Sequence, residues 1–266
     1  MKFKIDHDYH IHSQISTCSK DPKQTPERIL DYAQQYGLSK ICITDHFWDE
    51  TVKGGSSWYE PQNFEHVSAV LPLPKREGID FYFGCETELN GEHTLGISRS
   101  TIDKFDFVII PTTHLHMKNY TIRADATAEE RAVAYVERLD AVLNMDLPFN
   151  KIGIAHLACG LIMPGYAIEK VLSLVSDEDL ERLFKKSAEL GVGIEINSAD
   201  FRFSDKTPEQ IEQVLRVFGL AKDAGCKFYL GSDAHHPKEL DKAIPIFEEA
   251  AERLDLTEND KFDPFG

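Results

Sequence analysis

Residues 227–235 read Lys-Phe-Tyr-Leu-Gly-Ser-Asp-Ala-His, a short apolar run that gives way to Asp233 and His235. A run of aromatic and aliphatic residues that ends at a glycine is typical of a buried β-strand. The following stretch, Pro237 to Arg253, fits a helix. This part of the chain therefore predicts a strand that presents two metal-competent side chains at its carboxyl end and then leads into a helix.

The same alternation of strand and helix runs along the rest of the chain. Helix signals occur at Thr25-Pro26, where an amphipathic stretch begins that Gly37 ends, and at two capping boxes that begin with Thr127 and Thr207. A further helix fits Ser176 to Leu190. Besides the run already quoted, the predicted strands are Phe3 to Ile5, Lys40 to Thr44, Ile79 to Phe83, Phe105 to Pro111, Lys151 to Ala155 and Val192 to Ile196.

This alternation favours parallel strands covered by helices, and about seven strands in a chain of 266 residues fit a (β/α) barrel better than an open sheet. We therefore predict an α/β fold with a single domain over residues 1–266. Residues 48–63 hold two glycines and two serines between two tryptophans and predict a long loop after the second strand. This loop is either a lid over a site or a solvated surface excursion.

Composition narrows the choice of partners. Lys and Arg number 29 against 45 Asp and Glu, and the net charge of −16 repels a polyphosphate backbone, so nucleic acid is an unfavourable main partner. A small anionic substrate would need local positive charge from metals, Arg or Lys. The amino terminus has no apolar run of the kind found in signal peptides or membrane spans, which favours a cytoplasmic protein without a membrane partner. The five cysteines are widely spaced and indicate neither a disulfide framework nor a zinc ribbon.

The residues that follow six of the predicted strands share one chemical character, because each can bind a metal ion. In a barrel, the carboxyl ends of the strands converge on one face, where active sites are built from several strands at once. Six of the eleven histidines gather there. In chain order, the strand ends present His10 and His12, then Asp45-His46, Glu86, His114, His156, and Asp233 with His235.

The spacing of these residues suits metal binding. His10-Ile11-His12 puts two imidazoles on the same face of an extended chain, so both can share one ion. Asp233-Ala234-His235 has the same spacing and can reach one ion, or two ions about 3.5 to 4 Å apart. Glu86 suits a bridge, because a carboxylate has two oxygens. A single histidine such as His114 or His156 is more often a hydrogen-bonded core residue, but six such strand ends together favour a metal site.

Seven motifs in this order resemble those of the polymerase and histidinol phosphatase (PHP) superfamily, from about His7 to His236. They are His10-Ile11-His12, Ile43-Thr44-Asp45-His46, Gly84-Cys85-Glu86, Ile109 to His114, Ala155-His156, Glu195-Ile196-Asn197 and Gly231-Ser232-Asp233-Ala234-His235. The resemblance implies one PHP-type metallohydrolase domain with a distorted, TIM-like (β/α)7 barrel. It also implies that this barrel holds two or three divalent ions of zinc, manganese or iron.

The same resemblance, carried over position by position, implies a set of ligands for each ion. The first ion would take His10, His12, Glu86 and Asp233, and the second would take Glu86, His114 and His156. His46 and His235 would serve a third ion. One position departs from the family pattern, since Cys18 stands where members often carry a further histidine. A thiolate is a good zinc ligand, so either the third site survives with a softer set of ligands, or it is weakened or empty.

Neighbours of these motifs are candidates for catalysis. His116 and His236 adjoin ligand positions, and each is a candidate for the general acid or for a group that orients a ligand. The alternative is that they are merely neighbours of a motif. Asp45 is expected to orient His46 or another ligand rather than bind metal.

Three cations are candidates for substrate binding. Lys118, Arg123 and Arg202 follow strand ends on the expected active face, where a phosphate group could meet them, and His116 is a further candidate for substrate binding. Solvated loop charge is the alternative for the cations and is slightly favoured for Lys118 and Arg123. Arg202 lies close behind Glu195-Ile196-Asn197 and is the preferred phosphate clamp.

The combined interpretation is a metal-dependent phosphoesterase that hydrolyses a small phosphate monoester, such as a histidinol-phosphate-like, nucleotide or sugar phosphate. A hydroxide that bridges two metal ions would attack phosphorus, with Asp233, His235 and Arg202 in the catalytic group. An amidohydrolase would instead need a bridging carboxylated lysine and a solitary late aspartate. A non-catalytic metal-binding or regulatory PHP module is a further alternative. The sequence carries no signal of oligomeric state.

Overall fold

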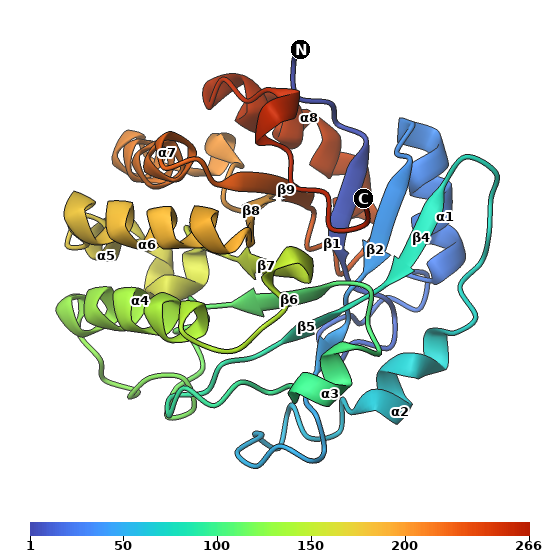
Figure 1. Ribbon diagram of the computed structural model, residues 1–266, viewed down its shortest axis with the longest axis horizontal. Coiled ribbons are helices and arrows are strands. Elements are labelled where there is room, and N and C mark those ends of the chain that lie inside the picture. The colour runs from blue at the N-terminus through green and yellow to red at the C-terminus, as the bar shows by residue number, and fades with distance from the viewer.

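Parallel β-strands alternate with α-helices in the computed structural model, which describes residues 1–266 apart from the side chain of Tyr166 (Figure 1). The strands are β1 (His7–Ile11), β2 (Lys40–Ile43), β3 (His46–Phe47), β4 (Asp80–Phe83), β5 (Cys85–Thr87), β6 (Val108–Pro111), β7 (Ile152–Ala155), β8 (Gly193–Asn197) and β9 (Lys227–Gly231). The helices are α1 (Pro26–Tyr36), α2 (Phe64–Val67), α3 (Arg99–Ile102), α4 (Ala128–Leu143), α5 (Glu169–Leu172), α6 (Asp177–Leu190), α7 (Pro208–Asp223) and α8 (Pro237–Arg253). None of these helices is long and apolar enough to cross a membrane.

The strands form a closed, distorted barrel with seven strand positions. β2 and β3 share one position and β4 and β5 another, with interruptions at Thr44-Asp45 and at Gly84. Backbone hydrogen bonds continue across the interruptions, for example from Gly84 N to Ile43 O at 2.8 Å. The barrel closes between β9 and β1, where Asp233 N donates to His10 O at 2.7 Å. The predicted α/β barrel is therefore confirmed, and Figure 1 shows the long helices α1, α4, α6, α7 and α8 around its outside.

Most predicted elements lie where the sequence placed them. α1 follows Thr25, whose side chain accepts a hydrogen bond from Arg28 N, and it ends at Gly37, whose φ of 71° suits glycine. α4 and α7 begin with the predicted capping boxes of Thr127 and Thr207. The bounds of α6 and α8 also agree with the prediction. β2, β4, β6, β7, β8 and β9 differ from the predicted runs by only a few residues at their ends, whereas the short strands β3 and β5 were not predicted.

The strand predicted at Phe3 to Ile5 is wrong, because β1 begins only at His7. Every residue of β1 is buried, including polar ones. Two of these polar side chains bind β9 and the turn that follows it: His7 Nε2 accepts from Leu230 N at 3.1 Å, and Asp8 Oδ1 accepts from Ser232 N at 2.9 Å. Because these partners lie 223 and 224 positions away in the chain, a search for local apolar runs does not detect this strand.

A bulge in β1 directs two neighbouring side chains into the barrel. Tyr9 and His10 together oppose a single residue of β2, Cys42. Strict alternation would put Tyr9 and Ile11 on the same face of the strand. Instead, Tyr9 packs inside the barrel, and Ile11 packs in the outer core between the strands and the helices. The bulge thus frees His10 to face the interior directly after Tyr9.

A mainly aromatic cluster fills the amino-terminal end of the barrel. Its buried members are Tyr9, Cys42, Phe107, Ile109, Ala155, Tyr229 and Phe262. Phe262 follows α8 and lies against Gly193 at the start of β8, where any Cβ would come within 2.5 Å of the Phe262 ring. These large side chains exclude water from this end of the barrel. The polar side chains of the strands gather at the opposite, carboxyl end.

We expect Gly231→Ala to destabilise the fold at the closure between β9 and β1. A Cβ at this position would overlap Glu195 Oε1 and lie 2.8 Å from His10 Cβ, and both residues are fully buried. Overpacking of this kind costs about 1–3 kcal/mol of unfolding free energy. Urea unfolding followed by circular dichroism measures this loss.

Gly219→Ala is the matched control, because nothing lies within 4 Å of a Cβ at this position inside α7. Replacement of a helical glycine by alanine is expected to stabilise by about 0.5–1 kcal/mol. Similar effects of the two substitutions on the unfolding free energy would contradict the close approach at Gly231.

Candidate metal centre

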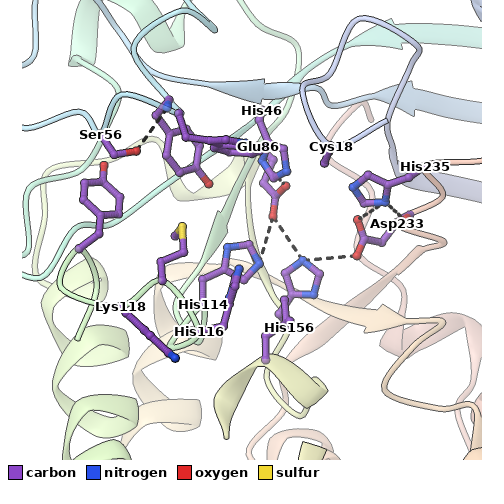
Figure 2. A pocket seen from close by; sticks show the side chains of 15 residues that line it. Cys18, His46, Ser56, Glu86, His114, His116, Lys118, His156, Asp233 and His235 are labelled. Atoms are coloured by element: carbon purple, nitrogen blue, oxygen red, sulfur yellow. Dashed lines mark hydrogen bonds and ion pairs between the residues drawn. The ribbon is translucent and has the colours of Figure 1, made fainter. Parts of the chain in front are cut away.

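Ligand-type side chains meet at the carboxyl end of the barrel (Figure 2). The cluster comprises His10, His12, Cys18, His46, Glu86, His114, His156, Asp233 and His235. Most of these side chains are buried, and Cys18, Asp233 and His235 are partly exposed at the mouth of the barrel. Figure 2 shows Glu86 between His46, His114 and His156, with Cys18, Asp233 and His235 to one side. The structure thus brings together all nine side chains that the sequence proposed as ligands.

Four donor atoms of this cluster lie at the distances expected around one metal ion. Nε2 of His10 and Nε2 of His12 are 3.2 Å apart. Asp233 Oδ1 lies 3.4 Å from the first nitrogen and 3.1 Å from the second, and Glu86 Oε2 lies 3.6 Å and 3.4 Å from them. Two ligand atoms bound tetrahedrally at about 2.0–2.1 Å from zinc are themselves about 3.3 Å apart. These side chains therefore fit a metal ion without rearrangement.

Glu86 connects this group to a second one. Its other oxygen, Oε1, lies 3.3 Å from His156 Nε2 and 3.9 Å from His114 Nε2. The three donor atoms form a separate group able to hold an ion. Because the two oxygens of Glu86 face different groups of imidazoles, this carboxylate can serve both groups at once.

The hydrogen bonding of Glu86 also suits metal ions. Its side chain is fully buried, yet neither oxygen has a hydrogen-bond partner in the described structure. His46 Nδ1 lies only 2.9 Å from Glu86 Oε2, but this nitrogen likewise has no hydrogen-bond partner in the described structure. A buried charge without partners is costly. Metal cations that bind the two oxygens would remove this cost.

Cys18 completes a third group. Ligand atoms of His12, Cys18, His46 and His235 lie within 4.8 Å of one another. Because His12 Nε2 already belongs to the first group, the donors that remain are Cys18, His46 and His235. Nδ1 of His235 is 2.7 Å from the backbone oxygen of Asp233 and donates its proton there, which leaves Nε2 free to bind metal.

Two further carboxylates, to which the sequence assigned no role, orient the histidines. Glu195 Oε1 lies 2.6 Å from His10 Nδ1, and Glu88 Oε2 lies 2.9 Å from His114 Nδ1. Each carboxylate accepts the Nδ1 proton and so directs the Nε2 lone pair toward the centre. Glu88 could have been found in the sequence, because it stands two positions after Glu86 and therefore on the same face of an extended chain.

Asp45 acts on the turn after β1. Its two carboxylate oxygens accept hydrogen bonds from N and Oγ of Ser13, each at 2.7 Å, and Oδ1 lies 4.0 Å from His12 Nδ1. Asp45 thus holds the turn that carries Ser13, and that it orients a ligand stays a prediction.

Two of the ligand-type residues have an uncommon backbone conformation. The φ angles of His156 and Asp233 are 65° and 53°, in the left-handed region that residues with a side chain rarely adopt. Such conformations cost about 1–3 kcal/mol each and persist where the surrounding structure holds them. Ala158 N donates to Asp200 Oδ2 at 3.1 Å and helps to hold the turn after His156.

Burial and mutual charge shift the pKa values in the cluster. Burial alone would raise the pKa of Glu86 and Asp233, but the neighbouring histidines outweigh it and hold both values well below the usual range. Burial lowers the pKa of His12, but a Cys18 thiolate and the carboxylates Asp233 and Glu86 together raise it to about 9. In the metal-free protein, protons on such histidines therefore supply the positive charge that metal ions would otherwise bring.

A cavity of about 490 Å³ opens over the cluster. Its walls include Trp58 and Tyr59 from the predicted loop at residues 48–63, which the structure shows without long helices or strands. Met117, Lys118, Tyr120 and Leu161 complete the walls beside His116 and Ser56. The loop is thus a wall of the cavity rather than a solvated excursion.

The catalytic and substrate-binding residues that were predicted outside the ligand groups divide into two sets. Lys118 and His116 line the cavity, whereas Arg123, Arg202 and His236 are not among its lining residues. Arg123 pairs with an exposed glutamate of α4 at 2.7 Å. Arg202 is 3.8 Å from Asp205 in the turn after β8, and His236 caps α8 with its ring 2.9 Å from Asp21. These three residues are close to motifs in the sequence, but their side chains do not line the cavity.

Comparison with known proteins agrees with this geometry. Residues 8–199 match the family model of the PHP domain. A probable phosphatase of Caldanaerobacter subterraneus subsp. tengcongensis is 28% identical over 258 residues, which cover 94% of this chain and 85% of the relative. A probable phosphatase of Caldicellulosiruptor saccharolyticus is 28% identical over 217 residues, 81% of this chain and 75% of the relative.

Among solved structures, this chain resembles histidinol phosphate phosphatase from Lactococcus lactis subsp. lactis, which was determined with zinc, L-histidinol and phosphate. The TM-score is 0.58 at 22% sequence identity, and the match covers 92% of this chain and 93% of the other. At this level of identity the likeness supports the barrel fold.

Substitution of Cys18 tests the third group of ligand atoms. If the sulfur binds metal, Cys18→Ser should lower the metal content by one equivalent, whereas Cys18→His should retain it, because both thiolate and imidazole are zinc ligands. Elemental analysis measures the content. Cobalt loading gives a second readout, since a thiolate–cobalt charge-transfer band should be present in the wild type and absent from both variants. Equal metal content and an unchanged spectrum in Cys18→Ser would reject the sulfur as a ligand.

Metal binding should displace protons. The pKa of His12 in the metal-free folded protein is about 9, against 6.5 for an unperturbed histidine, so its proton stabilises the metal-free fold below pH 6.5 and this contribution is lost as the pH rises through 9. Apparent zinc affinity should therefore rise by about tenfold per pH unit for each displaced proton and level off above the raised pKa. Calorimetry in two buffers of different ionisation enthalpy measures the protons released. Binding that is independent of pH would contradict this coupling.

Proposed function

Because this chain belongs to the PHP domain family, we propose that it is a metal-dependent phosphoesterase that hydrolyses a small phosphate monoester. The observation that carries the proposal is the arrangement around Glu86, in which two groups of donor atoms share one buried carboxylate at the floor of an open cavity. Relatives named as probable phosphatases align over most of both chains and support the same reaction.

We assign the ligands to three ions. His10, His12 and Glu86 would hold one ion together with Asp233, whose Oδ1 lies 3.4 Å and 3.1 Å from the two imidazoles. Glu86, His114 and His156 would hold a second. Cys18, His46 and His235 would hold a third. Zinc, manganese and iron all suit imidazole and carboxylate ligands, and the thiolate favours zinc at the third position. When bound, such ions supply the Lewis acidity that activates water near neutral pH and neutralises phosphoryl charge.

The protein itself positions these groups and shapes the space for the substrate. Glu195 and Glu88 fix the orientation of His10 and His114, so the ligand set is rigid before substrate arrives. The side chain of His116 is exposed on one side, but desolvation of its buried part and the neighbouring His114 lower its pKa to about 4. Its imidazole is therefore uncharged at neutral pH and can donate a hydrogen bond to a substrate oxygen. The proposal assigns no role to Arg202, Arg123 or His236.

The acidic character of the chain is compatible with an anionic substrate. The net charge of −16 belongs to the whole chain, whereas the acidic residues that line the cavity are Glu86 and Asp233, both of which belong to the ligand groups. Metal ions at these carboxylates would make the local charge positive. A phosphate group can therefore enter a cavity that differs in sign from the rest of the surface.

The contacts favour this reaction class over the amidohydrolase alternative. That class would place a carboxylated lysine between the two ions, whereas here the atoms that face both groups belong to Glu86. Lys118, which lines the cavity, is exposed and is not part of the described ligand groups. Asp233 is also accompanied by His235, as the PHP motif requires.

Metal dependence tests the proposed function. Exhaustive chelation should abolish hydrolysis of an aryl phosphate, and zinc or manganese should restore it, because the nucleophile is water activated by metal. Glu86→Gln should lower kcat/KM by on the order of a hundredfold or more, since it removes a ligand charge from two groups. The matched control is Glu129→Gln, which changes an exposed carboxylate on α4 and should leave the activity unchanged. Full activity of metal-free protein would exclude the proposed mechanism.

A further inference from the structure

We propose that the cavity selects phosphate esters whose alcohol carries an aromatic ring and no positive charge. This inference rests on the proposed phosphoesterase function and names the substrate class of the same site. It follows from the chemistry of the cavity walls, which differ sharply from the floor. The floor consists of ligand-type side chains, whereas three aromatic residues, Trp58, Tyr59 and Tyr120, contribute to the walls.

Trp58 is the principal contact that we infer for the ring. Tryptophan side chains are usually mostly buried, yet this one, of the two in the chain, is 37% exposed. Its ring lies 4.9 Å from that of His46 and 4.7 Å from that of Tyr59, in edge geometry with both. The indole is therefore placed directly beside a proposed metal ligand and has surface left for a ligand ring. A ring of the substrate can reach it while the phosphate is at the ligand cluster.

This wall is held in place before substrate binds. Tyr59 is buried, and its hydroxyl donates to Glu88 Oε2 at 3.3 Å. The backbone oxygen of Trp58 accepts from Gln62 Nε2 at 3.1 Å, and Gln62 Oε1 accepts from Thr17 N at 3.1 Å. Because the loop is anchored both to the barrel and to the turn after β1, little conformational entropy is lost when a ring packs against it.

Other apolar groups extend the aromatic wall. Met117 and Leu161 line the cavity together with Tyr120, whose ring stacks on that of Tyr59 at 6.1 Å. A thioether and aliphatic side chains pack well against aromatic rings. The space beside the ligand cluster therefore suits a flat apolar group better than a sugar or a polar chain alone.

The charged groups that line the cavity disfavour a substrate whose alcohol carries a positive charge. The acidic residues that line the cavity both belong to the ligand groups, so no lining carboxylate remains to pair with an ammonium group. Glu88 is buried behind the wall and is already engaged by His114 and Arg138. Lys118 lines the cavity, and Figure 2 shows it across the view from Cys18 and Asp233. Aromatic faces attract cations, but Lys118 and the metal ions would repel an ammonium group more strongly.

Three matched alkyl phosphates test the inference on the metal-loaded wild-type protein. They are 3-phenylpropyl phosphate, 3-cyclohexylpropyl phosphate, which lacks the aromatic ring, and O-phosphorylated phenylalaninol (2-amino-3-phenylpropyl phosphate), which adds only an ammonium group. We expect kcat/KM for the phenyl ester to exceed that for the cyclohexyl ester by about two- to tenfold, the value of one aromatic contact. We expect it to exceed that for the ammonium ester by about tenfold or more.

Variants then assign the two preferences to residues. Trp58→Leu should bring the phenyl-to-cyclohexyl ratio close to one, mainly through KM, whereas Trp58→Phe should keep most of it. Lys118→Gln should narrow the discrimination against the ammonium ester and leave the phenyl-to-cyclohexyl ratio as it was. Leu174→Ala is the control, because Leu174 is 49% exposed but does not line this cavity, and it should change neither ratio. Circular dichroism shows whether each variant is folded.

The outcomes separate the inference from the proposed function. Equal hydrolysis of all three esters by the wild type, or a preference for the ammonium ester, would overturn the inference and leave the phosphoesterase intact. A phenyl preference that survives in folded Trp58→Leu would overturn the assignment to this wall. If the metal-loaded protein hydrolyses neither an aryl phosphate nor any of the three esters, the proposed function itself fails. If Trp58→Leu does not fold, the ratios measured for the wild type and for Lys118→Gln still test the inference.

Discussion

The carboxylate of Glu86 is the group on which the rest of the site depends. It is completely withdrawn from water and has no hydrogen-bond partner, while imidazoles approach it from several strands. An isolated buried carboxylate would be too costly to retain its charge, so the surrounding groups must supply positive charge as protons or as metal ions. The histidines that converge at the carboxyl end of the barrel meet this requirement, because they can carry the protons or bind the metal ions.

Rigid support for these histidines comes from carboxylates outside the ligand groups. Glu195 holds His10, and its second oxygen accepts from His156 N at 3.1 Å, so one side chain connects two strand ends. Glu88 holds His114 and is itself held by Arg138, which also donates to three backbone oxygens from within the core. A buried arginine that donates hydrogen bonds to all these acceptors is held in one position and cannot move as a free surface charge does. Through Tyr59, the same Glu88 also steadies the aromatic wall of the cavity.

The two ends of the barrel interior therefore have opposite chemistry for one structural reason. Aromatic side chains and the carboxy-terminal Phe262 fill one end, and this packing leaves the other end as the place where polar side chains of all strands can meet. The bulge in β1 contributes to both ends, since it turns Tyr9 toward the aromatic cluster and His10 toward the ligand cluster. Fold and site are thus built from the same strands, with neighbouring residues assigned to different tasks.

Local sequence was sufficient for the long helices and for the identity of the ligand-type residues. Capping boxes and apolar spacing act over a few residues, so both ends of α1 and the starts of α4 and α7 could be predicted. Histidines and carboxylates that follow successive strands must converge in any parallel barrel, so their meeting could also be predicted. β1 could not, because its polar residues are buried against distant parts of the chain, such as β9 and the turn that follows it. Nor could the cavity walls: Trp58, Tyr120 and Leu161 meet only after the chain has closed, and Arg202 points elsewhere despite its place beside a motif. Which ligand-type side chains gather at one end of the barrel follows from residue type and strand order. Which side chains line the cavity depends on how separate loops pack, and that packing has no local signal.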